Sequence, residues 1–130
     1  SILEAQSQRH PLESLAPVVS REEVMDLCEA VKQVRITRDL QEYIVRIVAQ
    51  TREIPEVKLA ASPRASLGLL RISQALTLFQ GAEFVVPETI QALAPDVVAH
   101  RLVLEADAAY AGRSGRDVVA EVIETLEVPV

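Results

Sequence analysis

Apolar residues recur every three or four positions along most of the chain, which is the spacing of amphipathic α-helices. The first such stretch predicts a helix over residues 21–34, because Ser20 and Glu23 stand where a capping box needs a hydroxyl and a carboxylate. A second helix is predicted over residues 37–52, with Thr37 as its N-cap and a break at residues 51–55. The apolar faces of these helices comprise Val24, Leu27, Cys28, Val31 and Val34, and Leu40, Tyr43, Ile44, Ile47 and Val48.

The third predicted helix begins at Ser62-Pro63 and ends at Gly81. Ser62 offers an N-cap hydroxyl, Pro63 suits the first helical position because it needs no N–H there, and Gly81 suits the turn that closes a helix. This helix is apolar around most of its circumference. We therefore expect it at the centre of a bundle, covered on more than one side by the flanking helices.

The remaining sequence predicts two more helices and little sheet. Pro87 opens a fourth helix with a kink or break near Pro95, and Ser114 and Asp117 cap a final helix after a surface loop at residues 111–115. Residues 84–86 and 102–104 are β-prone. The expected fold is mainly all-α, a bundle of about five helices over residues 20–130, preceded by an extended arm at residues 1–19 and including at most a very short β-ribbon near residues 84–86 and 102–104.

Composition narrows the functional classes. With 49% hydrophobic residues, 25% charged residues and a net charge of −6, the chain has the make-up of one globular domain. No apolar run approaches the ~20 residues of a membrane span, and no secretory signal is visible. Acidic charge and 3% aromatic content argue against nucleic-acid binding.

Histidine and cysteine content predicts neither a metal site nor an internal disulfide. His10 and His100 are far apart in the sequence, and Cys28 is the single cysteine. We expect Cys28 to be a small buried hydrophobic residue in a reducing, cytoplasmic compartment.

No complete active site is evident, because the chain lacks phosphate-binding glycine motifs and a nucleophile elbow. Carboxylate pairs such as Glu22-Glu23 are expected on solvated helix faces. Arg64 stands out because it lies in the first turn of the third helix. A guanidinium at that positive helix end is unfavourable for the helix itself but well placed to receive a phosphate; the alternative is an ordinary exposed arginine.

Several motifs in order resemble the C-terminal lid of MoxR-type AAA+ ATPases. The resemblance covers roughly residues 10–127. Its motifs are His10-Pro11-Leu12, Leu15-Ala16-Pro17-Val18, Tyr43-Ile44-Val45, Thr51-Arg52, Ala61-Ser62-Pro63-Arg64-Ala65, Leu69-Leu70-Arg71, Phe84-Val85-Val86-Pro87, Leu93-Ala94-Pro95 and His100-Arg101-Leu102.

The resemblance implies that Arg64 is the sensor-2 arginine, which contacts the γ-phosphate of ATP and couples ATP binding and hydrolysis to conformational change. Ser62 is expected to be the N-cap of its helix rather than a ligand. Ala60 departs from the glycine expected before this motif, so the turn there could differ. Walker A, Walker B, sensor 1 and the arginine finger are not in this chain, so the fragment itself is not expected to be an enzyme. Mg²⁺ would be held by a core domain outside the sequence, and residues 1–19 would form the linker from that core.

The resemblance also implies a core ATPase domain as partner, a ring oligomer, chaperone-like remodelling and partnership with von Willebrand factor A-domain proteins. It gives no role to Arg52, Arg71, His100 or Arg101 beyond a structural one. Exposed apolar surface is expected near residues 59–65 and at the start of the helix over 37–52, where a core would dock. The rival interpretation is a free-standing helical interaction module without a nucleotide role; a small helical enzyme lacks any convergent catalytic set.

Overall fold

The computed structural model describes residues 15–129, which form a mainly helical domain, as predicted. The first 14 residues of the predicted arm lie outside the described residues, and residues 15–20 contain no helix or strand. The elements are α2 (Arg21–Gln33), α3 (Arg38–Gln50), β1 (Val57–Leu59), α4 (Pro63–Phe79), α5 (Pro87–Val98), the 3₁₀ turn η2 (Ala99–Arg101), β2 (Val103–Leu104), α6 (Ala106–Tyr110) and α7 (Gly115–Thr125).

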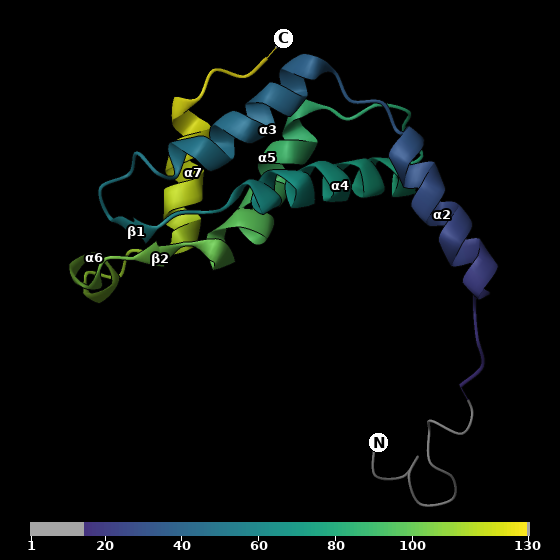
Figure 1. The fold of residues 1–130 in the computed structure, drawn as a ribbon, viewed down its shortest axis with the longest axis horizontal. Coiled ribbons are helices and arrows are strands. Elements are labelled where there is room, and N and C mark those ends of the chain that lie inside the picture. Colours follow the sequence, from purple (N-terminus) through teal and green to yellow (C-terminus); the bar gives the residue numbers. More distant parts are fainter. Residues whose placement is uncertain (1–14, 130) are drawn as a thin grey trace, which may run out of the picture.

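Helix α4 is the central element, which confirms the expectation from its apolar circumference. It contacts α2, α3 and α5, while α7 packs against α3 and α5. Figure 1 shows α2 projecting from the bundle near the C-terminal end of α4, whereas β1, β2 and α6 lie toward the opposite end. Cys28, Val31 and Lys32 of α2 line one pocket with Gly68, Arg71, Ile72 and Ala75 of α4, so α2 also packs beside the middle of α4.

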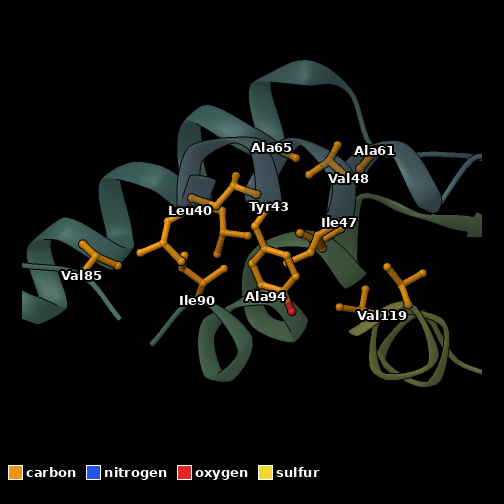
Figure 2. Packing of buried hydrophobic residues seen from close by; sticks show 14 of the residues in the cluster. Leu40, Tyr43, Ile47, Val48, Ala61, Ala65, Val85, Ile90, Ala94 and Val119 are labelled. Carbon is orange, nitrogen blue, oxygen red and sulfur yellow. The ribbon is translucent and has the colours of Figure 1, made fainter. Parts of the chain in front are cut away.

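The core lies between α3, α4, α5 and α7. All five predicted apolar positions of α3 are buried, and Tyr43 lies among them with its hydroxyl accepting a hydrogen bond from Gln91 Nε2 at 3.1 Å. Ala65 and Leu69 bring α4 into the same cluster, and Ile90, Ala94 and Val98 do so for α5 (Figure 2). The spacing of these positions is the helical period that the sequence displayed.

Both predicted capping boxes are present. The backbone N–H of Glu23 donates to Ser20 Oγ at 3.1 Å, and that of Asp117 donates to Ser114 Oγ at 3.3 Å. In return each carboxylate accepts from the backbone N–H of its serine, at 2.6 Å for Glu23 and 2.8 Å for Asp117. The pKa of Glu23 is lowered mainly by the hydrogen bond from the backbone of Ser20, and further by the bond to its side chain. The pKa of Asp117 is lowered mainly by the hydrogen bond from the side chain of Ser114, and further by the bond from its backbone. Both carboxylates are therefore ionised acceptors at neutral pH.

Gly81 ends α4 as predicted. Its φ of 71° lies in the left-handed region, where a side chain would be strained. The N–H of Gly81 donates to the carbonyl of Leu78 at 2.9 Å and that of Ala82 to the carbonyl of Thr77 at 3.0 Å, which is the Schellman arrangement.

Ser62 occupies the N-cap position of α4, but the predicted side-chain cap is absent. The backbone N–H of Ala65, the third helical residue, donates instead to the carbonyl of Ser62 at 2.8 Å. Pro63 has no N–H to offer. One of the two donors that an N-cap hydroxyl can use, the N–H of Ala65, is therefore taken by the backbone of the same residue, and the other, the N–H of Arg64, finds no acceptor among the described residues.

The predicted β-ribbon has a different partner. β2 pairs antiparallel with β1, an element that the sequence did not predict, rather than with residues 84–86. Phe84 forms only an isolated parallel bridge with Arg35. That bridge cannot lengthen into a ladder, because α3 and α5 begin within three residues of it.

Pro95 does not break α5, which continues to Val98. Proline removes one backbone hydrogen bond from a helix interior, but Ile90, Ala94 and Val98 bury apolar surface on both sides of Pro95.

The 3₁₀ turn η2 and α6, a helix of five residues, were not predicted. Elements this short contain too few residues for a helical period of apolar positions to be recognised.

Cys28 is exposed, so the expectation that it is buried was wrong. Helix α2 has no buried residue, and Val24, Met25 and Leu27 are exposed as well. The reason is the position of α2, which packs mainly against α4 and has no second helix to cover its apolar face. The helical period was correct, but it does not reveal whether the apolar face is covered within this chain.

Ser62 and Ser114, two of the three serine N-caps among the described helices, provide a matched test of the cap geometry. Ser114→Ala should lower the free energy of unfolding by about 1 kcal/mol, because it removes a side-chain cap. Ser62→Ala should change it by no more than a few tenths of a kcal/mol, because no cap bond is lost. Urea unfolding of the two variants measures the difference; equal destabilisation would contradict the cap assignment.

Gly115 is required by a close backbone approach. A Cβ at this position would lie 2.6 Å from the carbonyl oxygen of Ala99, whereas one at Gly68 would lie 3.6 Å from Val97 Cγ1. We expect Gly115→Ala to destabilise the fold by about 1–3 kcal/mol, and Gly68→Ala in the interior of α4 to stabilise it by about 0.5–1 kcal/mol. Thermal unfolding of both variants checks the opposite signs.

Candidate functional site

The turn that opens α4 is held by small buried side chains. Ala61, just before the helix, is 1% exposed, and Ala65 in its first turn is 0% exposed. Both belong to the core cluster that also contains Val48 (Figure 2). Between them Ser62, Pro63 and Arg64 are exposed. The two alanines thus fix the turn against the core and leave the three residues between them facing solvent.

Arg64 is available for an external ligand. Within residues 15–129 its guanidinium makes no hydrogen bond or ion pair, and its backbone N–H finds no acceptor. The first turn of a helix carries partial positive charge from its unpaired N–H groups. Because α4 has no acidic residue in its first turn, this charge and that of Arg64 are not offset locally. The arrangement suits an anionic group such as a phosphate.

Exposed apolar residues flank Arg64, as predicted for the segment near residues 59–65. Leu59 on β1 is 61% exposed, and Leu67, one turn further along α4, is 63% exposed. The second predicted location, the start of α3, is apolar on its surface as well. Phe84 is 58% exposed and lines a pocket with Ile36 and Thr37 there. Within α3 itself, Leu40 is buried and the exposed apolar residue is Val45 near the middle. Apolar exposure on both sides of a bare arginine is typical of a surface that another protein domain covers.

Ala60 does not disturb the turn before α4. Among the described residues, only Gly81 and Gly112 have a positive φ, so Ala60 adopts a conformation that alanine tolerates. The backbone leading to Arg64 therefore needs no glycine at this position.

The four residues without an assigned role lie in three different places. The Nη2 atom of Arg52 is 3.5 Å from the carbonyl oxygen of Ala61, which places Arg52 beside the turn that opens α4. Arg71 donates to Gln74 Oε1 at 3.0 Å. His100 Nδ1 lies 3.0 Å from the carbonyl oxygen of Asp96, and Arg101 Nε donates to the carbonyl of Val97 at 3.2 Å. His100 and Arg101 thus contact carbonyls near the C-terminal end of α5, a structural role that was one of the alternatives.

The surface at Arg64 is not a closed pocket. A pocket of about 590 Å³ is lined by Arg35, Ile36, Thr37, Phe84 and Val85, at a different place in the fold. Within the described range, no group of three or more His, Cys, Asp or Glu residues is arranged to hold a metal ion, and no helix is both long and apolar enough to cross a bilayer. The surface at Arg64 thus offers one cationic side chain beside the N-terminus of a helix.

Sequence reasoning missed three polar residues buried in α4, namely Ser73, Gln74 and Thr77. A signal was present, because Ala65, Leu69, Ser73 and Thr77 recur at intervals of four residues and so lie along one helical stripe. Polar residues in line with buried apolar ones are candidates for a positioning role.

Comparison with known proteins shows which family the chain belongs to. Residues 49–122 match the family model described as the AAA lid domain. The chain is 38% identical over 129 residues to YeaC of Bacillus subtilis, an uncharacterized protein, with 99% of this chain and 40% of YeaC covered. It is 34% identical over 122 residues to the chaperone MoxR1 of Mycobacterium tuberculosis, with 86% of this chain and 32% of MoxR1 covered.

A solved structure shares the fold. The crystal structure of a candidate ATPase from Cytophaga hutchinsonii superimposes with a TM-score of 0.86 at 24% sequence identity, covering 98% of this chain and 41% of that one. The chain thus spans less than half the length of each of these three proteins.

These matches define a class of helical domain that forms one part of larger proteins. The chain belongs to the AAA lid domain family, and within it to the lids of the MoxR type.

Proposed function

We propose that Arg64 is a sensor-2 arginine, which contacts the γ-phosphate of ATP bound by a core domain of the same polypeptide. The observation that carries the proposal is the exposed guanidinium at the positive end of α4, which has no hydrogen bond or ion pair within residues 15–129 and stands on a turn held by buried Ala61 and Ala65. An arginine suits this task because its planar donors match phosphate oxygens and it stays charged at every physiological pH. Ser62 shapes the turn and is not a ligand.

The proposed contact would couple nucleotide state to the orientation of the lid. A γ-phosphate brings negative charge that Arg64 can neutralise, and hydrolysis removes that charge from the contact. The lid then has a different interaction free energy with the core before and after hydrolysis, which is the requirement for a ligand-driven conformational shift. The core would supply the Mg²⁺ ligands, the attacking water and the remaining nucleotide contacts, so the fragment alone would not hydrolyse ATP.

The family suggests an activity, an assembly and partners for the longer protein. We propose that the longer protein is a cytoplasmic, chaperone-like ATPase that assembles into a ring, with von Willebrand factor A-domain proteins as candidate partners. The relative MoxR1 carries the description of a chaperone, which supports this choice.

A second candidate is an interaction module without a nucleotide role. The observation that favours it is the open apolar face of α2, where Val24, Leu27 and Cys28 are exposed. A partner helix could dock on such a face. This alternative gives Arg64 no function. The two candidates therefore differ in the effect that replacing Arg64 should have on ATP hydrolysis.

Substitution of Arg64 in the longer ATPase distinguishes the sensor-2 role from the interaction module. Arg64→Ala should lower kcat for ATP hydrolysis by about 100-fold or more, because it removes a charged donor from the transferring phosphate. Arg46→Ala is the matched control, since Arg46 is also an exposed helical arginine and lies on α3. Steady-state ATPase assays of both variants give the comparison.

Full activity of Arg64→Ala would overturn the sensor-2 assignment and favour the interaction module. Melting temperatures of the 130-residue chain with and without the substitution show whether the fold is retained, as we expect because Arg64 is exposed and makes no hydrogen bond or ion pair within residues 15–129. ATP added to this chain alone should shift amide NMR signals at residues 61–66 only weakly, because most of the proposed site lies in the core.

A further inference from the structure

The joint between α2 and α3 is held by one buried side chain of α4. Gln74 is 4% exposed, and its Nε2 donates to the carbonyl oxygen of Val34 at 2.8 Å. Val34 is the C-cap of α2 and is itself buried, so its carbonyl lies at the end of the helix, where the intrahelical donors run out. The Gln74 amide therefore satisfies a carbonyl that would otherwise be buried without this partner.

Both ends of the Gln74 amide are used. Its Oε1 accepts from Arg71 Nη1 at 3.0 Å, which orients the amide so that its nitrogen faces Val34. The neighbouring buried hydroxyls of Ser73 and Thr77 have no partner within the described residues. Gln74 thus differs from the other buried polar residues of α4, because it bonds to a separate element of the fold.

The orientation of α2 rests on this bond and on packing against α4 that leaves every side chain of α2 at least partly exposed. Helix α2 buries no side chain and packs mainly on α4. On the far side of the joint, the N–H of Arg35 donates to the carbonyl of Glu83 at 3.1 Å, and the carbonyl of Arg35 accepts from Val85 at 2.9 Å. Residue 35 is therefore fixed to the bundle, so a change in the angle of α2 would require rotation about the backbone bonds between Gln33 and Arg35.

Helix α4 connects this joint to Arg64. The ten residues from Arg64 to Gln74 span roughly 15 Å of continuous helix at 1.5 Å per residue. No proline lies between them, and Ala65 and Leu69 are buried on the side that faces the core. A displacement of α4 at its N-terminus would therefore move Gln74 as part of the same rigid body.

We propose that Gln74 is a positioning residue that sets the angle of α2 against the bundle and transmits movement of α4 to α2. The first half, the angle of α2, rests on the bond from Gln74 to Val34 together with the packing of α2 on α4, while the transmission to α2 rests on the proposed function of Arg64. The two halves have separate tests.

The first test measures the position of α2 in the 130-residue chain, which has its own core. Cys28 is the single cysteine and is exposed on α2, so it accepts one spin label without further change. A second label on Ala120→Cys, at an exposed position of α7, provides the reference on the bundle. Electron–electron double resonance then reports the distribution of distances between the two labels.

Two variants of Gln74 remove the donor to Val34. Gln74→Glu keeps the length of the side chain and its pairing with Arg71, and Gln74→Met replaces the amide by a flexible apolar group of similar size. In both variants we expect a second distance between the two labels to appear. The ratio of molecules with the original distance to molecules with the new distance should be roughly tenfold lower than in the parent chain. If one variant fails to fold by circular dichroism, the other still gives the result.

Thr77→Val is the matched control. Thr77 lies three residues after Gln74 on α4, is equally buried, and has a hydroxyl without a partner among the described residues. Its replacement should leave the distance distribution unchanged. Folded Gln74 variants with the parent distribution, or an equal change in Thr77→Val, would overturn the assignment of Gln74.

The second test concerns transmission and uses the longer ATPase. Gln74→Met should lower kcat for ATP several-fold with KM for ATP unchanged, because nucleotide contact at Arg64 is intact while its effect on α2 is lost. An unchanged kcat in Gln74→Met, beside an inactive Arg64→Ala, would overturn the transmission and leave the proposed function standing. A fully active Arg64→Ala would overturn the proposed function, whereas the distance measurement would still decide the role of Gln74 in the joint.

Discussion

Two small side chains, Ala61 and Ala65, are buried on either side of the exposed turn at residues 62–64. Because neither has more than a Cβ, the backbone at the start of α4 can lie directly against the core formed with α3. Larger residues would push this turn outward and change the direction of the first helical turn. The exposure of Arg64, the direction of the helix dipole behind it and the apolar rim of Leu59 and Leu67 all depend on this close packing.

The same packing explains why a bare arginine is compatible with a stable fold. Arg64 contributes nothing to the core, and a positive charge in the first turn is mildly unfavourable for α4. The helix is held by Leu69 and by its contacts with α2, α3 and α5. Stability is thus supplied by one face of α4 while a functional group is presented at its end, a division that is common at binding sites.

Local chemistry predicted most of the fold. The caps at Ser20 and Ser114 and the closing turn at Gly81 involve only residues close to one another in the sequence, so their geometry could be predicted from a short segment. The predictions that were wrong involve distant partners: β2 pairs with β1 and not with residues 84–86, and the apolar face of α2 has no second helix to cover it. At Ser62 the error was local: its hydroxyl caps neither nearby N–H, and the N–H of Ala65 donates to the Ser62 carbonyl instead. For the site, the motif around Arg64 indicated the residue and the structure added its exposure and lack of partners, whereas the bond from Gln74 to Val34, 40 residues away, could not be predicted from spacing.

We have proposed that Arg64 meets the γ-phosphate of a nucleotide held by the rest of the polypeptide. A crystal structure of the longer protein with a non-hydrolysable ATP analogue and Mg²⁺ would show this contact. We expect the Arg64 guanidinium to lie about 2.7–2.9 Å from a γ-phosphate oxygen, the distance of a charge-assisted hydrogen bond, with Leu59 and Leu67 covered by the core. A γ-phosphate enclosed by other residues, with Arg64 still facing solvent, would contradict it.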